Sequence, residues 1–211
     1  MSAPLIHIID DDTALRTALG RLLGASGYRV VAHESGEAFR SSPTAHEPGC
    51  ILLDVNMPGL TGLQLQEHLV RTGSILPIVF LTGNGDIAMS VRAIKAGAED
   101  FLSKPIAKDD LLDAIGRAMV RFEQAQARHA GMADLRKRHA ALTAREAEVF
   151  ALVIQGLLNK QIAFKLGNTE RTVKAQRQAV MEKLGADSVA DLVQMGLKLG
   201  LAAGIAPKDK C

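Results

Sequence analysis

The sequence contains no tryptophan, and aromatic residues make up only 3% of its 211 positions. Its cores must therefore be built from aliphatic side chains, and a surface that binds single-stranded nucleic acid by stacking bases on aromatic rings is disfavoured. Cysteine is almost as scarce. Cys50 leads into an apolar run and Cys211 ends a lysine-rich tail. This pattern indicates neither a disulfide framework nor a cysteine metal site.

Long hydrophobic runs are also missing. No apolar segment approaches the length of a membrane span, and the first residues lack the basic region of an export signal. We therefore expect a cytoplasmic protein with no membrane partner. The 47% hydrophobic content is that of a folded chain with one or two cores.

The small net charge of +2 conceals an asymmetry. Residues 1–122 hold 11 Lys and Arg against 14 Asp and Glu, a net charge of −3, whereas residues 123–211 hold 14 against 9, a net charge of +5. The division predicts two parts with separate tasks and makes a polyanion a candidate partner of the second. A net charge of +5 is also common among solvated helical domains, so charge alone leaves both interpretations open.

Five apolar runs alternate with helical patterns in the first part. The apolar runs cover residues 5–9, 28–32, 51–55, 77–82 and 100–104. The helical patterns cover residues 13–23, which Asp12 or Thr13 would cap, a short segment that Ser35 would start, and residues 62–70, 87–96 and 109 to about 129. This alternation predicts an α/β fold with a doubly wound, five-stranded parallel sheet.

Polar side chains follow four of the five predicted strands. Asp10 and Asp11, Asp54, Thr82 and Lys104 stand at or just past the ends of strands one, three, four and five. Because parallel strands share a carboxyl edge, we expect these side chains to meet there. Clustered carboxylates suit Mg²⁺, and a lysine with a hydroxyl could hold an anion on Asp54, as in phosphoryl transfer to a carboxylate. Alone, an aspartate after a strand often only starts a turn.

These motifs carry a family resemblance. Asp10-Asp11, Asp54–Gly62, Leu81–Gly83 and Phe101–Pro105, in this order and spacing, resemble a bacterial response-regulator receiver domain over about residues 4–122. The resemblance implies a flavodoxin-like fold. It also implies that Asp54 accepts a phosphoryl group from a sensor histidine kinase.

The resemblance further implies a metal site. Asp11, Asp54 and the backbone carbonyl of Asn56 would bind Mg²⁺ or Mn²⁺, and Asp10 would contribute through water. Asn56 and Asn84 could position a water molecule, so slow self-dephosphorylation is expected.

Thr82 and Lys104 would, by the same resemblance, hold the phosphoryl oxygens. Phe101 matches the aromatic switch residue of the family, which turns inward as Thr82 moves, although a plain core phenylalanine is the alternative. Lys104-Pro105 resembles a cis peptide of the family.

The second part is predicted to be helical throughout. Residues 123–138 continue the preceding helix without a clear apolar stripe and indicate a solvated helical linker. A short coiled-coil contact is the alternative, although the segment holds too few heptads to support it. Residues 139–204 contain four short helical patterns, the first opened by the capping box Thr143 to Glu146. Two helices, 159–167 and 170–184, are joined by a tight turn, which is typical of a helix-turn-helix. Residues 205–211 form a predicted flexible tail.

The string from Leu142 to Gly185 resembles the LuxR-type DNA-binding domain. With the receiver, the whole chain resembles a FixJ-type response regulator of the NarL group. Asn168 and Gln176 depart from the family pattern, and the last helix, 186–201, matches a dimer surface of the family. The residues that the resemblance places at or near DNA are Lys160, Thr169, Arg171, Thr172, Lys174, Arg177 and Gln178.

The implied function is a phosphorylation-dependent transcriptional regulator rather than an enzyme. It would dimerise through the receiver, bind double-stranded promoter DNA and act as an activator, with RNA polymerase as a further candidate partner.

Three other functions would use some of the same residues. An RNA-binding or protein-binding helical output remains open. An aspartyl-phosphate hydrolase of the haloacid dehalogenase type is disfavoured, because such enzymes need a second acid where this chain has Asn56. A metal enzyme built from the six histidines is disfavoured, because no two lie at ligand spacing on a helix.

Overall fold

The structure, a computed structural model, describes residues 4–83 and 87–201, with residues 87–90 described for their backbone only. It contains two compact units, Met1–Ala127 and Arg128–Cys211. In the described residues no helix is both long and apolar enough to cross a membrane.

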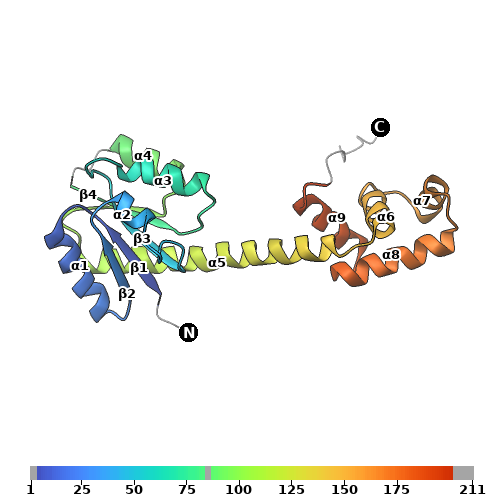
Figure 1. Cartoon of the computed structure of the whole chain (residues 1–211), viewed down its shortest axis with the longest axis horizontal. Coiled ribbons are helices and arrows are strands. Elements are labelled where there is room, and N and C mark those ends of the chain that lie inside the picture. The colour runs from blue at the N-terminus through green and yellow to red at the C-terminus, as the bar shows by residue number, and fades with distance from the viewer. Residues whose placement is uncertain (1–3, 84–86, 202–211) are drawn as a thin grey trace. The chain divides into compact units, whose positions relative to one another are not determined.

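The first unit is built on one sheet of five parallel strands, in the order β2-β1-β3-β4-β5. The predicted doubly wound sheet is therefore confirmed (Figure 1). Its register pairs Asp54 with Leu81 and Thr82 with Ser103, which aligns the carboxyl ends of the strands. The strands are β1 (Leu5–Ile9), β2 (Arg29–His33), β3 (Gly49–Asp54), β4 (Ile78–Thr82) and β5 (Asp100–Ser103).

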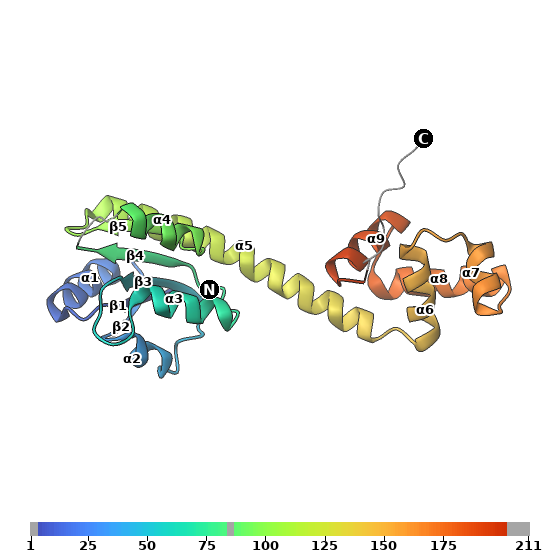
Figure 2. The same cartoon turned by 90° about the horizontal axis from the view of Figure 1, so that it is seen from above.

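Five helices cover the two faces of this sheet (Figure 2). Helices α1 and α5 bury Leu19, Leu23 and Leu111 against Ile8 and Leu52. Helices α2, α3 and α4 pack on the opposite face, in a second buried cluster. Because both faces are covered, the central strands are buried along their length and mostly apolar. The helices are α1 (Thr13–Ala25), α2 (Gly36–Arg40), α3 (Gly62–Arg71), α4 (Ile87–Lys95) and α5 (Lys108–Ala140).

Short-range polar contacts set the helix starts. The Asp12 carboxylate accepts hydrogen bonds from the backbone N–H groups of Ala14 and Leu15, so Asp12 rather than Thr13 caps α1. Ser35 caps α2, as predicted, and Thr61 caps α3. Helix α1 runs two residues past the predicted end at Leu23, since Gly24 lies inside its last turn.

The second unit holds the end of α5 and four further helices, as the sequence predicted. Their apolar faces share one buried cluster that includes Phe150, Ile162, Val173 and Val180. The four helices are α6 (Ala144–Ile154), α7 (Asn159–Leu166), α8 (Glu170–Leu184) and α9 (Val189–Lys198).

The predicted linker is helical. Helix α5 continues without interruption to Ala140, and residues 123–134 are exposed apart from the half-buried Ala125 and Met132. Leu135, one turn later, is buried. The division between the two compact units falls inside this exposed stretch.

Candidate functional site

Three aspartates meet at the carboxyl edge of the sheet. Asp10 and Asp11 follow β1, and Asp54 ends β3, the neighbouring strand. One carboxylate oxygen of each lies within 4.8 Å of the others. Asp10 and Asp54 are buried, whereas Asp11 is exposed. Oxygen donors at this separation fit a hard cation such as Mg²⁺.

Lys104 brings the balancing charge from the loop after β5. Its Nζ donates to Asp10 Oδ2 at 2.7 Å and to Asp54 Oδ1 at 2.9 Å. Burial raises the pKa of Asp54, and the hydrogen bond from Lys104 opposes that rise. Burial alone would lower the pKa of Lys104, but its hydrogen bonds to the two aspartates outweigh burial and raise it. The lysine is therefore a fixed cation between two carboxylates.

The remaining predicted receiver residues lie around this cluster. Thr82 ends β4, is buried, and its backbone carbonyl accepts a hydrogen bond from the N–H of Lys104 at 2.6 Å. The Asn56 N–H donates to Asp54 Oδ2 at 3.2 Å. Phe101 is half-buried, with its ring centre 6.1 Å from that of Phe80. The Lys104-Pro105 peptide is cis, as expected, and Asn84 lies outside the described residues.

Two further residues, for which the sequence predicted no role, also shape this site. Gly62, at the start of α3, lies so close to β3 that a Cβ there would be 2.2 Å from the Asp54 carbonyl oxygen. Arg16 Nη1 donates to the Asp10 carbonyl oxygen at 2.6 Å. Gly62 closes the Asp54–Gly62 motif and begins a predicted helix, but neither signal gives its contact with β3, and nothing in the sequence marked Arg16.

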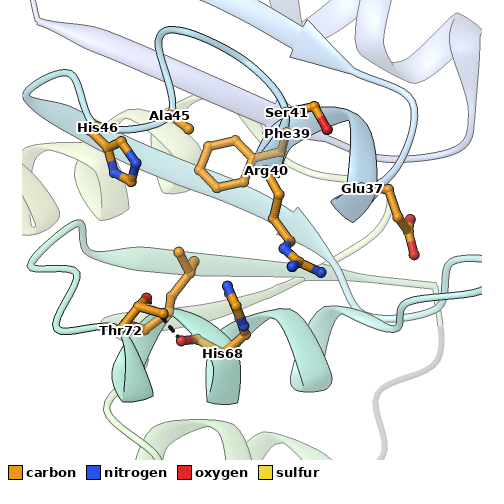
Figure 3. A pocket seen from close by; sticks show the side chains of 9 residues that line it. Glu37, Phe39, Arg40, Ser41, Ala45, His46, His68 and Thr72 are labelled. Atoms are coloured by element: carbon orange, nitrogen blue, oxygen red, sulfur yellow. Dashed lines mark hydrogen bonds between the residues drawn. The ribbon is translucent and has the colours of Figure 1, made fainter.

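A separate hollow of about 500 Å³ opens between α2, the loop after it and α3 (Figure 3). The side chains of Arg40 and His68 point toward each other across it. None of the residues that line it belongs to the aspartate cluster. The hollow is therefore distinct from the candidate site.

The second candidate surface is formed by α7 and α8. Thr169 caps α8 by accepting a hydrogen bond from the Thr172 N–H. Gly167, in the left-handed conformation at φ +63°, makes the tight turn between the helices. Ile162 of α7 and Val173 of α8 are both buried in the same hydrophobic core. The helix-turn-helix geometry predicted from the sequence is present.

The predicted DNA-contacting residues divide into two groups. The side chain of Arg177 is half-buried and donates to Asn159 Oδ1 at 3.0 Å, so it joins α8 to α7. Gln178 donates to Glu182 on the same helix. The exposed members are Lys160, Thr169, Arg171, Thr172, Lys174 and Gln178.

The two departures from the family pattern have different settings. Asn168 is half-buried in the turn, and its N–H donates to the Ala163 carbonyl. Gln176 is half-buried, and its Oε1 is enclosed with no hydrogen-bond partner in the described part of the chain.

Comparison with known families decides the identity of both units. Residues 6–116 match the response regulator receiver domain, and residues 140–196 match the bacterial regulatory proteins of the luxR family. The chain belongs to the FixJ/NarL-type response regulators. The response regulator is therefore a transcriptional regulator of a two-component system, not an enzyme in the usual sense, with a sensor kinase and DNA as the partners that its two domains imply.

Curated relatives resemble the response regulator over nearly its whole length. It is 42% identical to Nodulation protein W of Bradyrhizobium diazoefficiens, over 94% of this chain and 88% of the relative. It is 39% identical to the transcriptional regulatory protein FixJ of Azorhizobium caulinodans, over 97% of this chain and 95% of the relative.

Solved structures give the same result. The response regulator StyR aligns with a TM-score of 0.76 and 42% identity, over 93% of this chain and 99% of that one. Full-length FixJ from B. japonicum aligns with a TM-score of 0.58 and 36% identity, over 95% and 99%. Receivers bind Mg²⁺ at an acidic pocket, and this chain has the corresponding aspartate cluster.

Proposed function

We propose that Asp54 is the phosphoacceptor of this response regulator. The observation that carries the proposal is the Lys104 ammonium, held between Asp10 and Asp54 at 2.7 and 2.9 Å. Because the lysine already neutralises part of the cluster, it can stay beside Asp54 and bind the added phosphoryl oxygens. Thr82, at the end of the adjacent strand, supplies a hydroxyl for the same group.

The residues present fit a divalent cation. Asp11 and Asp54, with the backbone carbonyl of Asn56, would bind Mg²⁺ or Mn²⁺, and Asp10 would act through water. When bound, the ion would offset the negative charge that gathers during phosphoryl transfer. Asn56 supports slow self-dephosphorylation, since its side chain lies two residues from the acceptor and can hold water.

We infer a two-state output. Phosphorylation of Asp54 would draw Thr82 and Phe101 toward the site and favour a receiver homodimer. The dimer would present two copies of α8 to a two-part promoter site, acting as an activator that contacts RNA polymerase. Thr172, Lys174, Arg177 and Gln178 would face the major groove or its phosphates, and Lys160 and Arg171 would contact the DNA backbone. Arg177 would act at this surface from its contact with Asn159.

The domain boundaries are also part of this proposal. Residues 1–122 would form the receiver, 123–138 the helical linker, and 139–204 the DNA-binding domain, with a tail at 205–211. The break between compact units at residues 127 and 128 supports a boundary inside the linker. The tail lies outside the described residues. Because its proposed partner is promoter DNA, we place the regulator in the cytoplasm.

The phosphoacceptor is tested by intact mass. Incubation with acetyl phosphate and Mg²⁺ should add one phosphoryl group to the wild type and none to Asp54→Asn. Asp109→Asn, which changes an exposed aspartate at the start of α5, is the control and should still gain the group. An adduct that survives in Asp54→Asn would refute the assignment.

The output is tested by genomic footprinting with and without acetyl phosphate. We expect protection of two-part duplex sites that strengthens on phosphorylation in the wild type only. Binding should fall steeply with salt, because lysine and arginine contacts release counterions. Preferential binding of RNA, or no nucleic-acid binding, would favour the alternative outputs instead.

A further inference from the structure

The C-terminal end of α8 is fastened to α5 by one side chain. Arg138 Nη1 donates to the backbone carbonyl of Leu184, the last residue of α8, at 2.8 Å. The last carbonyls of a helix have no partner within the helix and carry partial negative charge. A guanidinium at this position therefore satisfies an otherwise unpaired acceptor.

Arg138 is held in place from its own helix. Its Nε donates to Asp134 Oδ2 at 2.8 Å, and its Nη2 contacts the same oxygen. Asp134 lies one turn earlier on α5. Because the two side chains are about half exposed, this ion pair alone adds little stability. Its effect is to aim the guanidinium at α8.

The end of α8 leaves space for the Arg138 guanidinium at Gly185. Gly185 follows Leu184 at φ +69°, in the left-handed conformation that glycine favours. A Cβ on Gly185 would lie 2.6 Å from Arg138 Nη1. The glycine thus both ends α8 and leaves room for the arginine.

A second contact fixes the same end of α8 inside its own domain. Lys183 Nζ donates to Glu146 Oε2 at 2.6 Å, and Glu146 closes the capping box of α6. Lys183 therefore joins α8 to α6, whereas Arg138 joins α8 to α5. Helix α5 is also the helix that buries Leu111 and Ile115 in the receiver core.

We propose that Arg138 is a positioning residue that keeps the recognition helix α8 in fixed register with α5. The proposal rests on the proposed function, in which paired recognition helices bind a two-part site. With Arg138 in place, the C-terminal end of α8 stays against the last turns of α5 inside the second compact unit, which would preorganise the recognition helices that a dimer presents. Without it, each helix still binds its half-site, but the pair is less well preorganised.

The test compares Arg138→Met with the wild type on the duplex found by footprinting and on a duplex that contains one half-site. We expect affinity of the phosphorylated variant for the two-part duplex to fall about five- to tenfold, with less than about twofold change on the half-site. Arg138→Lys, which can reach only one of the two acceptors, should lie between. Arg136→Met changes an exposed arginine that makes no hydrogen bond in the described structure, and should match the wild type.

The results distinguish failure of the Arg138 proposal from failure of the proposed function. If affinity for both duplexes falls equally, or the melting temperature alone falls, Arg138 is merely structural and the proposal is overturned. Unchanged affinity on both duplexes overturns it as well. If the wild type itself shows no phosphorylation-dependent preference for the two-part duplex, the proposed function fails instead.

Discussion

At the scale of single residues, the carboxyl edge of the receiver sheet depends on the pairing of two buried aspartates with one lysine. Asp10 is fully buried, yet it and Asp54 share one lysine. A buried carboxylate is tolerated only when it is paired, so removing the lysine leaves two like charges facing each other. Lys104 therefore serves the folded state as well as the chemistry proposed for Asp54.

Lys104→Met should slow phosphorylation of the protein by acetyl phosphate about a hundredfold, because the variant lacks the cation that would bind the phosphoryl oxygens. Intact-mass time courses measure the rate. Lys108→Met, an exposed lysine at the start of α5, is the matched control and should react at the wild-type rate. A Lys104→Met rate equal to wild type would contradict the role assigned to the lysine.

Two histidines form a buried pair on another part of the sheet. His7 Nδ1 lies 3.1 Å from His33 Nε2, and both rings pack edge-on against Phe39. Burial, with the neighbouring His33, lowers the pKa of His7 to about 4, although Glu47 opposes this shift. Burial also lowers the pKa of His33. Both histidines are therefore neutral in the folded protein near pH 7.

This pair predicts a loss of stability in acid. Between about pH 6.5 and pH 4 the unfolded chain binds a proton at His7 that the folded protein does not, so the free energy of unfolding falls as pH falls. His7→Leu should reduce the loss between pH 7 and pH 5 by about 1–2 kcal/mol in urea titrations. His46→Gln, which changes an exposed histidine, should keep the wild-type slope. Equal slopes in all three proteins would show that His7 is not the source.

At the scale of helices, capping decides where the elements of the second unit begin. Helix α6 starts at a complete capping box, in which Thr143 Oγ1 accepts from the Glu146 N–H and the Glu146 carboxylate accepts from the Thr143 N–H. Helix α9 begins with the same arrangement at Ser188 and Asp191. Each box satisfies backbone donors that the helix itself leaves unpaired.

Thr143→Ala should weaken the start of α6 by about 1 kcal/mol, because an N-cap oxygen is lost. Hydrogen exchange followed by mass spectrometry should show about fivefold faster exchange in the first turn of α6 and no change in α9. Thr143→Ser keeps the acceptor and should retain most of the protection. Unchanged exchange in Thr143→Ala would mean that the Glu146 contacts alone hold the helix start.

At the scale of the whole molecule, α5 is the element that belongs to both units. Its first turns are packed in the receiver core, whereas residues 123–134 are largely exposed. Gly131 lies in this exposed stretch. A Cβ added at Gly131 would point into open space, so an alanine side chain fits there. A glycine inside an exposed helix lowers its local stability.

Gly131→Ala should slow limited trypsin cleavage after Arg128 about fivefold, because alanine favours the helix by about 1 kcal/mol over glycine. Gel analysis of the digestion measures the rate, and the products should correspond to the two compact units. Gly116→Ala lies in the part of α5 beside the sheet and should leave the rate unchanged. Equal rates for Gly131→Ala and the wild type would show that local unfolding of α5 does not limit cleavage.

The sequence by itself determined the features that depend on near neighbours. The alternation of apolar runs and helical spacing predicted the five strands and the helices, and capping residues such as Ser35 and Thr143 predicted helix starts, because these signals act within one turn or one strand. The order of motifs also placed Asp54 and Lys104 at one sheet edge, since parallel strands leave little choice of edge.

Only the tertiary structure decided the contacts between distant residues. The bonds of Lys104 to Asp10 and Asp54 join positions 94 and 50 residues apart, and the bond of Arg138 to Leu184 spans 46. The same holds for the close approach of Gly62 to β3 and for the contact of Arg177 with Asn159, which takes that arginine partly out of solvent. Such contacts depend on how packed elements meet in space, and no local pattern encodes the distance between two atoms on different elements.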